Sequence, residues 1–133
     1  MADSYRFSEQ EHASVTRLEG SERYEHFVKR VADWQNVWGL KNETGWVSAE
    51  DDSGNRGIPV WPHPDYAAAC AKDEWAGNQP TPIEVQEFVA IWLPNMANDN
   101  VHVAVFPTTS MKGVMVPALQ LRDDLQEELA DYE

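Results

Sequence analysis

The chain has 133 residues, a length that suits one domain with one hydrophobic core. Ten Lys and Arg residues against 23 Asp and Glu residues give a formal net charge of −13. This excess of acid repels phosphate backbones and argues against direct nucleic-acid binding. No apolar stretch approaches the roughly 20 residues of a membrane-spanning helix, and the first ten residues lack the pattern of a signal peptide. We therefore expect a soluble, cytoplasmic protein, and the single cysteine, Cys70, agrees with a reducing compartment.

Two helices are predicted at the start of the chain. Ser8 and Glu11 have capping-box spacing, which indicates a helix over residues 8–18. Gly20 interrupts this pattern, so residues 1–20 are interpreted as an N-terminal helical extension and residues 21–133 as a single α+β domain. Ser21 is a candidate N-cap for the second helix, whose apolar face has the spacing of Tyr24, Phe27, Val28 and Val31.

Residues 37–62 are predicted to form a three-stranded antiparallel meander. Three short runs of aromatic and β-branched residues are separated there by turn-rich stretches at 42–45 and 51–57. Pro62 cannot donate a ladder hydrogen bond, so the third strand is expected to end near Trp61.

Two further helices are predicted in the middle of the chain. Pro64 suits the first turn of a short helix that would extend to about Lys72. Thr81, Pro82 and Glu84 then combine an N-cap, a proline at the first helical position and a capping-box acid. Pro94 is expected to end this helix.

The last third of the chain predicts a hairpin followed by a helix. Residues 101–107 alternate in the manner of a buried strand, and a loop leads to a second strand at 114–116. From Pro117 a narrow apolar stripe continues through Ala118, Leu121, Leu125, Leu129 and Tyr132. The order of elements favours an α+β fold with helices packed on a mainly antiparallel sheet, in a single compact domain.

Sequence motifs give little support for catalysis. The chain has no phosphate-cradling glycine loop, no nucleophile elbow and no dinucleotide fingerprint. Its four histidines fall on different predicted elements without a second ligand at helical spacing, so no metal site and no cofactor are expected. The acidic loop at 51–55 lacks the register of a calcium-binding loop.

His63 and Cys70 raise the question of a catalytic pair. Reactive cysteines are usually exposed at the start of a helix, whereas Cys70 lies about two turns into the predicted helix. Burial of Cys70 and a capping role for His63 are therefore favoured. A pocket at the corner of Trp61 and His63 stays open as an alternative.

Two surfaces are candidates for binding. The last helix concentrates acidic residues, among them Asp124 and Glu128, on its polar face. Six tryptophans are more than a core of this size easily encloses, and Trp75, in a loop between two predicted helices, is the best candidate for exposure. The candidate binding residues are Trp61, His63, Trp75, Asp124 and Glu128.

Several segments, read in order, resemble one family. They are ERYEHFVKRVADW, VWGL, VWPHPDYA, EWAG, WLP, VAVFPT and KGVMV. Over about residues 21–132 the chain resembles the bacterial domain-of-unknown-function family DUF2750. The resemblance implies a small cytoplasmic protein, and it supplies no catalytic residues.

The sequence therefore favours a small, acidic, non-enzymatic interaction or regulatory protein. A basic protein would be its partner, as for an immunity-type inhibitor or an adaptor. The alternative is a small enzyme or ligand-binding domain with a pocket near Trp61, His63 and Cys70. A homodimer formed through the stripe of the last helix is a third hypothesis.

Overall fold

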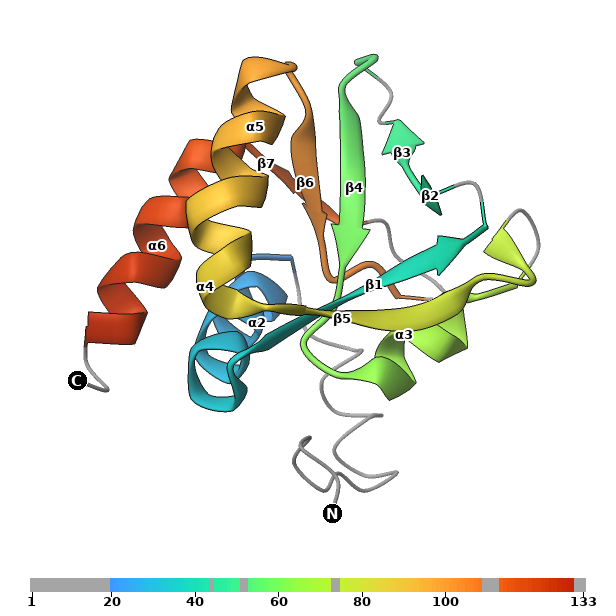
Figure 1. Cartoon of the computed structure of the whole chain (residues 1–133), viewed down its shortest axis with the longest axis horizontal. Helices are drawn as coiled ribbons and strands as arrows, with labels where there is room; N and C mark the ends of the chain where they lie inside the picture. The colour runs from blue at the N-terminus through green and yellow to red at the C-terminus, as the bar shows by residue number, and fades with distance from the viewer. Residues whose placement is uncertain (1–19, 44, 51–52, 73–74, 109–112, 131–133) are drawn as a thin grey trace.

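The computed structural model describes residues 20–43, 45–50, 53–72, 75–108 and 113–130, and it shows an α+β fold (Figure 1). Helices pack on two small sheets whose strand pairs are antiparallel except for one. The predicted fold class is confirmed. The helix predicted over residues 8–18 lies outside the described residues.

The first described helix, α2, spans Gly20–Trp34. Phe27, Val28 and Val31 are buried on its inner face, as their spacing predicts. The helix already includes Gly20, so Ser21 lies inside its first turn and is not the N-cap. Gly20 lies close to β7, because a Cβ atom at this position would be 3.1 Å from Cγ2 of Val114.

The first sheet has the order β2-β1-β5, where β1 is Asn36–Asn42, β2 is Gly45–Trp46 and β5 is Gln79–Glu84. Strand β5 pairs with β1 along its whole length, from Gln79 opposite Lys41 to Glu84 opposite Asn36. Pro80 and Pro82 alternate along β5, so both lack an N–H on the same side of the strand. An edge strand tolerates this, because its outer side has no ladder partner.

The second sheet has the order β3-β4-β6-β7, with β3 at Ala49–Glu50, β4 at Arg56–Val60, β6 at His102–Val105 and β7 at Val114–Val116. The hairpin of β6 and β7 is confirmed. The predicted meander is wrong, because β1 and β2 belong to one sheet whereas β3 and β4 belong to the other. The only parallel pair among the described strands joins β4 to β6.

Two tryptophans connect the sheets. Trp38 in β1 and Trp61, directly after β4, form an isolated antiparallel bridge. The N–H of each donates to the carbonyl oxygen of the other, over 2.9 Å from Trp38 and 2.7 Å from Trp61. The ribbon of β1 and β5 therefore crosses the ends of β4 and β6 (Figure 1).

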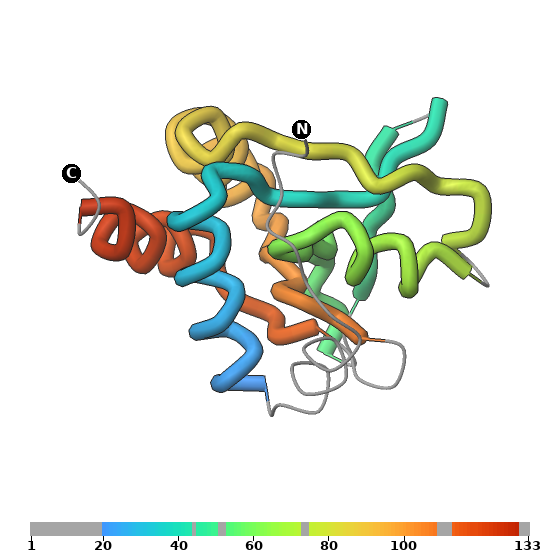
Figure 2. The backbone as a smooth tube through the Cα atoms, turned by 90° about the horizontal axis from the view of Figure 1, so that it is seen from below, coloured from blue at the N-terminus to red at the C-terminus, as the bar shows by residue number. Residues whose placement is uncertain are grey.

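Helix α3, Pro64–Cys70, lies against the β1–β5 ribbon (Figure 2). Pro64 is in its first turn, as predicted, and His63 is its N-cap. The helix ends two residues before the predicted Lys72.

The helix predicted from Thr81 begins later and ends later. Its first residues belong to β5, and α4, Val85–Glu87, uses Glu84 as N-cap. A π-helical turn, η2 at Phe88–Trp92, leads into α5, Leu93–Asn98. Pro94 therefore does not end the helix. The wide turn bonds the Leu93 N–H to the Phe88 carbonyl, which leaves room for a residue without an N–H.

The described part of the chain closes with α6, Ala118–Ala130, which packs on α2 and α5. Its stripe of Ala118, Leu121, Leu125 and Leu129 is buried, as predicted, and Tyr132 lies outside the described residues. Side chains from both sheets and from these helices share one hydrophobic cluster. None of the described helices has the length and apolar character needed to cross a membrane.

Candidate functional site

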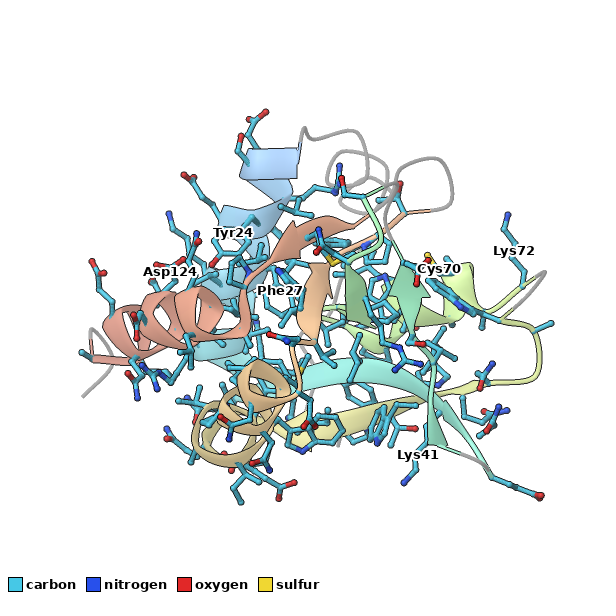
Figure 3. All side chains as sticks on the ribbon, turned by 90° about the horizontal axis from the view of Figure 1, so that it is seen from above. Tyr24, Phe27, Lys41, Cys70, Lys72 and Asp124 are labelled. Atoms are coloured by element: carbon cyan, nitrogen blue, oxygen red, sulfur yellow. The ribbon has the colours of Figure 1, made fainter. Side chains whose placement is uncertain are left out.

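The described residues form a groove of about 490 Å³ between α2 and α6, above β7. Figure 3 shows Tyr24 and Asp124 close together at this groove and Cys70 on the other side of the molecule. The lining residues are Ser21, Tyr24, Glu25, Val28, Lys29, Val114, Val116, Gln120, Asp124, Glu127 and Glu128. This volume falls in the range of roughly 300–1,000 Å³ that ligand sites occupy.

The floor of the groove is apolar. Val114 and Val116 alternate along β7, so their side chains lie on the same face of the strand. Val28 adds a third branched side chain from α2. Methylene groups of a bound molecule could therefore displace water from this floor favourably.

The rim of the groove is acidic. Glu25 lies on α2, and Asp124, Glu127 and Glu128 lie on α6, whereas Lys29 is the one basic residue among the described lining residues. Arg122, a base on the same helix, pairs with Asp123 over 3.2 Å and not with a rim acid. Four carboxylates and one ammonium give the described part of the rim a formal net charge of −3.

Tyr24 fixes the position of one rim carboxylate. Its hydroxyl donates a short hydrogen bond to Oδ2 of Asp124. Burial, and then the hydrogen bond and the charge of Asp124, raise the pKa of Tyr24 well above its usual value. The phenol thus stays protonated at neutral pH and continues to donate, while Oδ1 of Asp124 can accept from another group.

Of the predicted binding residues, the structure brings Asp124 and Glu128 together at this groove. They lie four residues apart on α6, so both side chains project from one face of the helix toward α2. Both are half-buried. The three aromatic candidates lie elsewhere, around α3 and the loop that follows it.

The Trp61 corner is filled by packed side chains. Trp61 is completely buried, and its indole N–H donates to the Pro107 carbonyl oxygen over 2.8 Å. His63 is 6% exposed, and its Nδ1 accepts from the Asp65 N–H over 3.1 Å, which confirms the capping role. Trp75 is half-buried and packs edge-on against Trp61, with ring centroids 6.1 Å apart.

Cys70 is buried as well, with 7% of its surface exposed. Its thiol donates to the Pro107 carbonyl oxygen over 3.5 Å. Burial raises the pKa of Cys70 despite the opposing effects of Trp61 and Lys72. A raised pKa and a buried sulfur are the properties of a structural cysteine and not of a nucleophile.

The sequence did not indicate Tyr24 or Lys29 as site residues, because the pairing of α2 with α6 is a tertiary feature. Arg23 was also missed. It is 2% exposed, and its Nε donates to the Phe106 carbonyl oxygen over 3.1 Å. Arg23 precedes the buried Phe27 by four residues, and this spacing was a usable signal of its burial.

The groove combines anionic and apolar groups. Its described lining offers carboxylates, apolar methyl groups and two hydroxyls, but neither a histidine nor a cysteine. Among the described residues, no group of three or more His, Cys, Asp or Glu side chains could hold a metal ion. The arrangement can bind a cation that also carries apolar groups.

Comparison with known proteins gives one match. Residues 24–125, more than half of the chain, match the family model described as "Protein of unknown function (DUF2750)". No curated protein and no solved structure matches the chain.

Proposed function

We propose that this chain, which belongs to the DUF2750 family, is a small non-enzymatic interaction module that binds a basic protein through the groove between α2 and α6. The observation that carries the proposal is the acidic rim around an apolar floor. Four carboxylates surround this floor with Lys29 as the one nearby base in the described lining. An immunity-type inhibitor of a basic toxin and a regulatory adaptor both fit this chemistry.

Electrostatics would act mainly on the rate of association. The net charge of −13 creates a field that attracts a basic partner from a distance, and salt screens this field. Individual exposed ion pairs contribute little to affinity, typically about 0–1 kcal/mol. We therefore expect the apolar floor to provide most of the affinity, and the acidic rim to raise the association rate and the selectivity for basic partners.

The other hypotheses have weaker support. A pocket near Trp61, His63 and Cys70 needs accessible side chains, whereas these three are buried and their polar atoms bond within the protein. Trp75 remains a candidate for a second, separate contact. Two copies of the chain would repel each other at this acidic face. The same face would repel the phosphate backbone of a nucleic acid.

The test is affinity capture from native lysate at low and high salt with three forms of the protein. They are the wild type, Asp124→Lys/Glu128→Lys, and the control Glu43→Lys/Asp99→Lys, which makes the same charge change at exposed positions away from the groove. We expect a basic protein that the wild type and the control retain at low salt and the groove variant loses. Equal retention by all three forms, or no salt-sensitive partner, would contradict the proposal.

A further inference from the structure

We infer that the partner anchors itself in the groove with an arginine side chain. The methylene groups of this arginine pack on Val28, Val114 and Val116, and its guanidinium lies between Asp124 and Glu128. This inference rests on the proposed function and adds the chemical identity of the contact. Its first basis is the division of the groove into two parts. An apolar floor below a carboxylate rim matches a side chain with an apolar stem and a charged end.

The arrangement of the carboxylates favours arginine over lysine. Asp124 and Glu128 are one helical turn apart, and both are half-buried. A planar guanidinium with five donors can bond to two carboxylates at once, and it loses less hydration on partial burial than an ammonium does. The Tyr24 hydroxyl holds Asp124 through Oδ2, so one acceptor of the pair is already in position.

The size and charge of the groove point to a partner protein and not to a small cation or a second copy. A volume of about 490 Å³ has room for a side chain together with adjoining backbone. A free polyamine would gain from the rim charge, but it would lack the forked donors that two neighbouring carboxylates favour. A second copy would bring another 13 net negative charges to an acidic surface.

The experiment is a titration of the full chain with three probes, followed by NMR of the valine methyl groups. The probes are acetyl-Gly-Arg-Gly-Arg-Gly-amide, its lysine counterpart and spermidine. We expect the methyl signals of Val28, Val114 and Val116 to shift with the arginine peptide. We also expect this peptide to bind at least about fivefold more tightly than the lysine peptide, a ratio of dissociation constants that corresponds to about 1 kcal/mol.

Gln120→Trp is a second groove variant, in addition to Asp124→Lys/Glu128→Lys. Gln120 is exposed on the groove wall, so an indole would fill the groove without changing its charge. Loss of arginine-peptide binding in this variant, with binding kept in Glu43→Lys/Asp99→Lys, would support the inference.

Two results would overturn the inference while leaving the proposed function intact. The first is that Gln120→Trp binds the arginine peptide as tightly as the wild type does and that the peptide leaves the valine methyl signals unshifted. The second is that the lysine peptide or spermidine binds the wild type as tightly as the arginine peptide does. Failure of all basic probes, together with equal capture by the three forms in lysate, would overturn both.

Discussion

The hydroxyl of Tyr24 in α2 donates a hydrogen bond to the carboxylate of Asp124 in α6, one hundred residues further along the chain. This contact joins the two helices that form the groove, and it positions a carboxylate that the proposed partner would contact. Stability and the proposed binding would therefore depend on the same pair of side chains. This relationship can be tested without knowledge of the partner.

A double-mutant cycle should measure the coupling of the pair. Tyr24→Phe removes the donor and Asp124→Ala removes the acceptor, and urea unfolding gives the free energy of unfolding of each form. Because the bond is charge-assisted but half-exposed, we expect a coupling of about 1 kcal/mol. A coupling near zero would show that the hydrogen bond adds nothing to stability.

Alkaline pH should weaken the protein through the same residue. An unfolded tyrosine loses its proton near pH 10, whereas the raised pKa of Tyr24 keeps the proton on the folded protein at higher pH. The folded state thus binds more protons than the unfolded state above about pH 10, and stability falls as pH rises. The loss of unfolding free energy between about pH 9 and pH 11 should be smaller in Tyr24→Phe than in the wild type. Identical pH profiles for the two forms would contradict this account.

Arg23 should be important for stability although it carries a charge in the core. Arg23→Ala leaves the buried Phe106 carbonyl oxygen without its Nε donor. We expect a loss of about 1–3 kcal/mol in the free energy of unfolding, measured with denaturant. Lys29→Ala, at an exposed position on the same helix, is the control and should cost less than about 0.5 kcal/mol. Similar losses in both variants would refute a special role for Arg23.

A side chain at Gly57 should destabilise the protein. A Cβ atom there would lie 2.5 Å from Sδ of Met115 and 3.2 Å from the Ala104 nitrogen. Overpacking of this kind typically costs about 1–3 kcal/mol, so Gly57→Ala should lower the midpoint of thermal unfolding. In a Met115→Ala background the clash with the methionine is absent, so Gly57→Ala should cost less stability there. This cost is the difference between Gly57→Ala/Met115→Ala and Met115→Ala. If Gly57→Ala costs the same in both backgrounds, Met115 is not the obstacle.

Cys70 should react slowly with thiol reagents in the folded protein. Its sulfur is buried and burial raises its pKa, so the thiolate is scarce and poorly accessible at neutral pH. We expect alkylation by iodoacetamide to be at least about tenfold slower in buffer than in denaturing urea, after correction for the effect of urea on a free thiol. Rapid modification of the folded protein would revive the hypothesis of a reactive site near His63.

Local patterns predicted the fold class and most elements, and they failed where pairing between distant segments decided the outcome. Thr81, Pro82 and Glu84 have the pattern of a helix start, yet these residues pair with β1 and form part of strand β5. Of the three, only Glu84 acts as a helix cap. Likewise, Pro94 is a helix breaker by its local chemistry, but the preceding π-helical turn accommodates it.

The candidate site was predicted in part, for the same reason. The charge pattern of the last helix indicated Asp124 and Glu128 directly. The opposite wall and the floor required knowledge that α2 packs on α6 above β7, which no local pattern contains. Trp61 and His63 were candidates because of their polar aromatic side chains, but both side chains bond within the protein. Trp61 donates to the Pro107 carbonyl oxygen, and His63 caps α3.

The alternation of the two sheets along the chain has a consequence for how the protein unfolds. Strand β4 lies in sequence between β1 and β5, and β5 in turn lies between β4 and β6. Any cut of the chain between β1 and β6 therefore separates the two members of at least one strand pair. The sheets are interlocked, because every continuous piece of the chain that holds all strands of one sheet also holds at least one strand of the other. We expect the β1–β6 region to be lost in one cooperative step, and the groove floor at β7 to disappear with it.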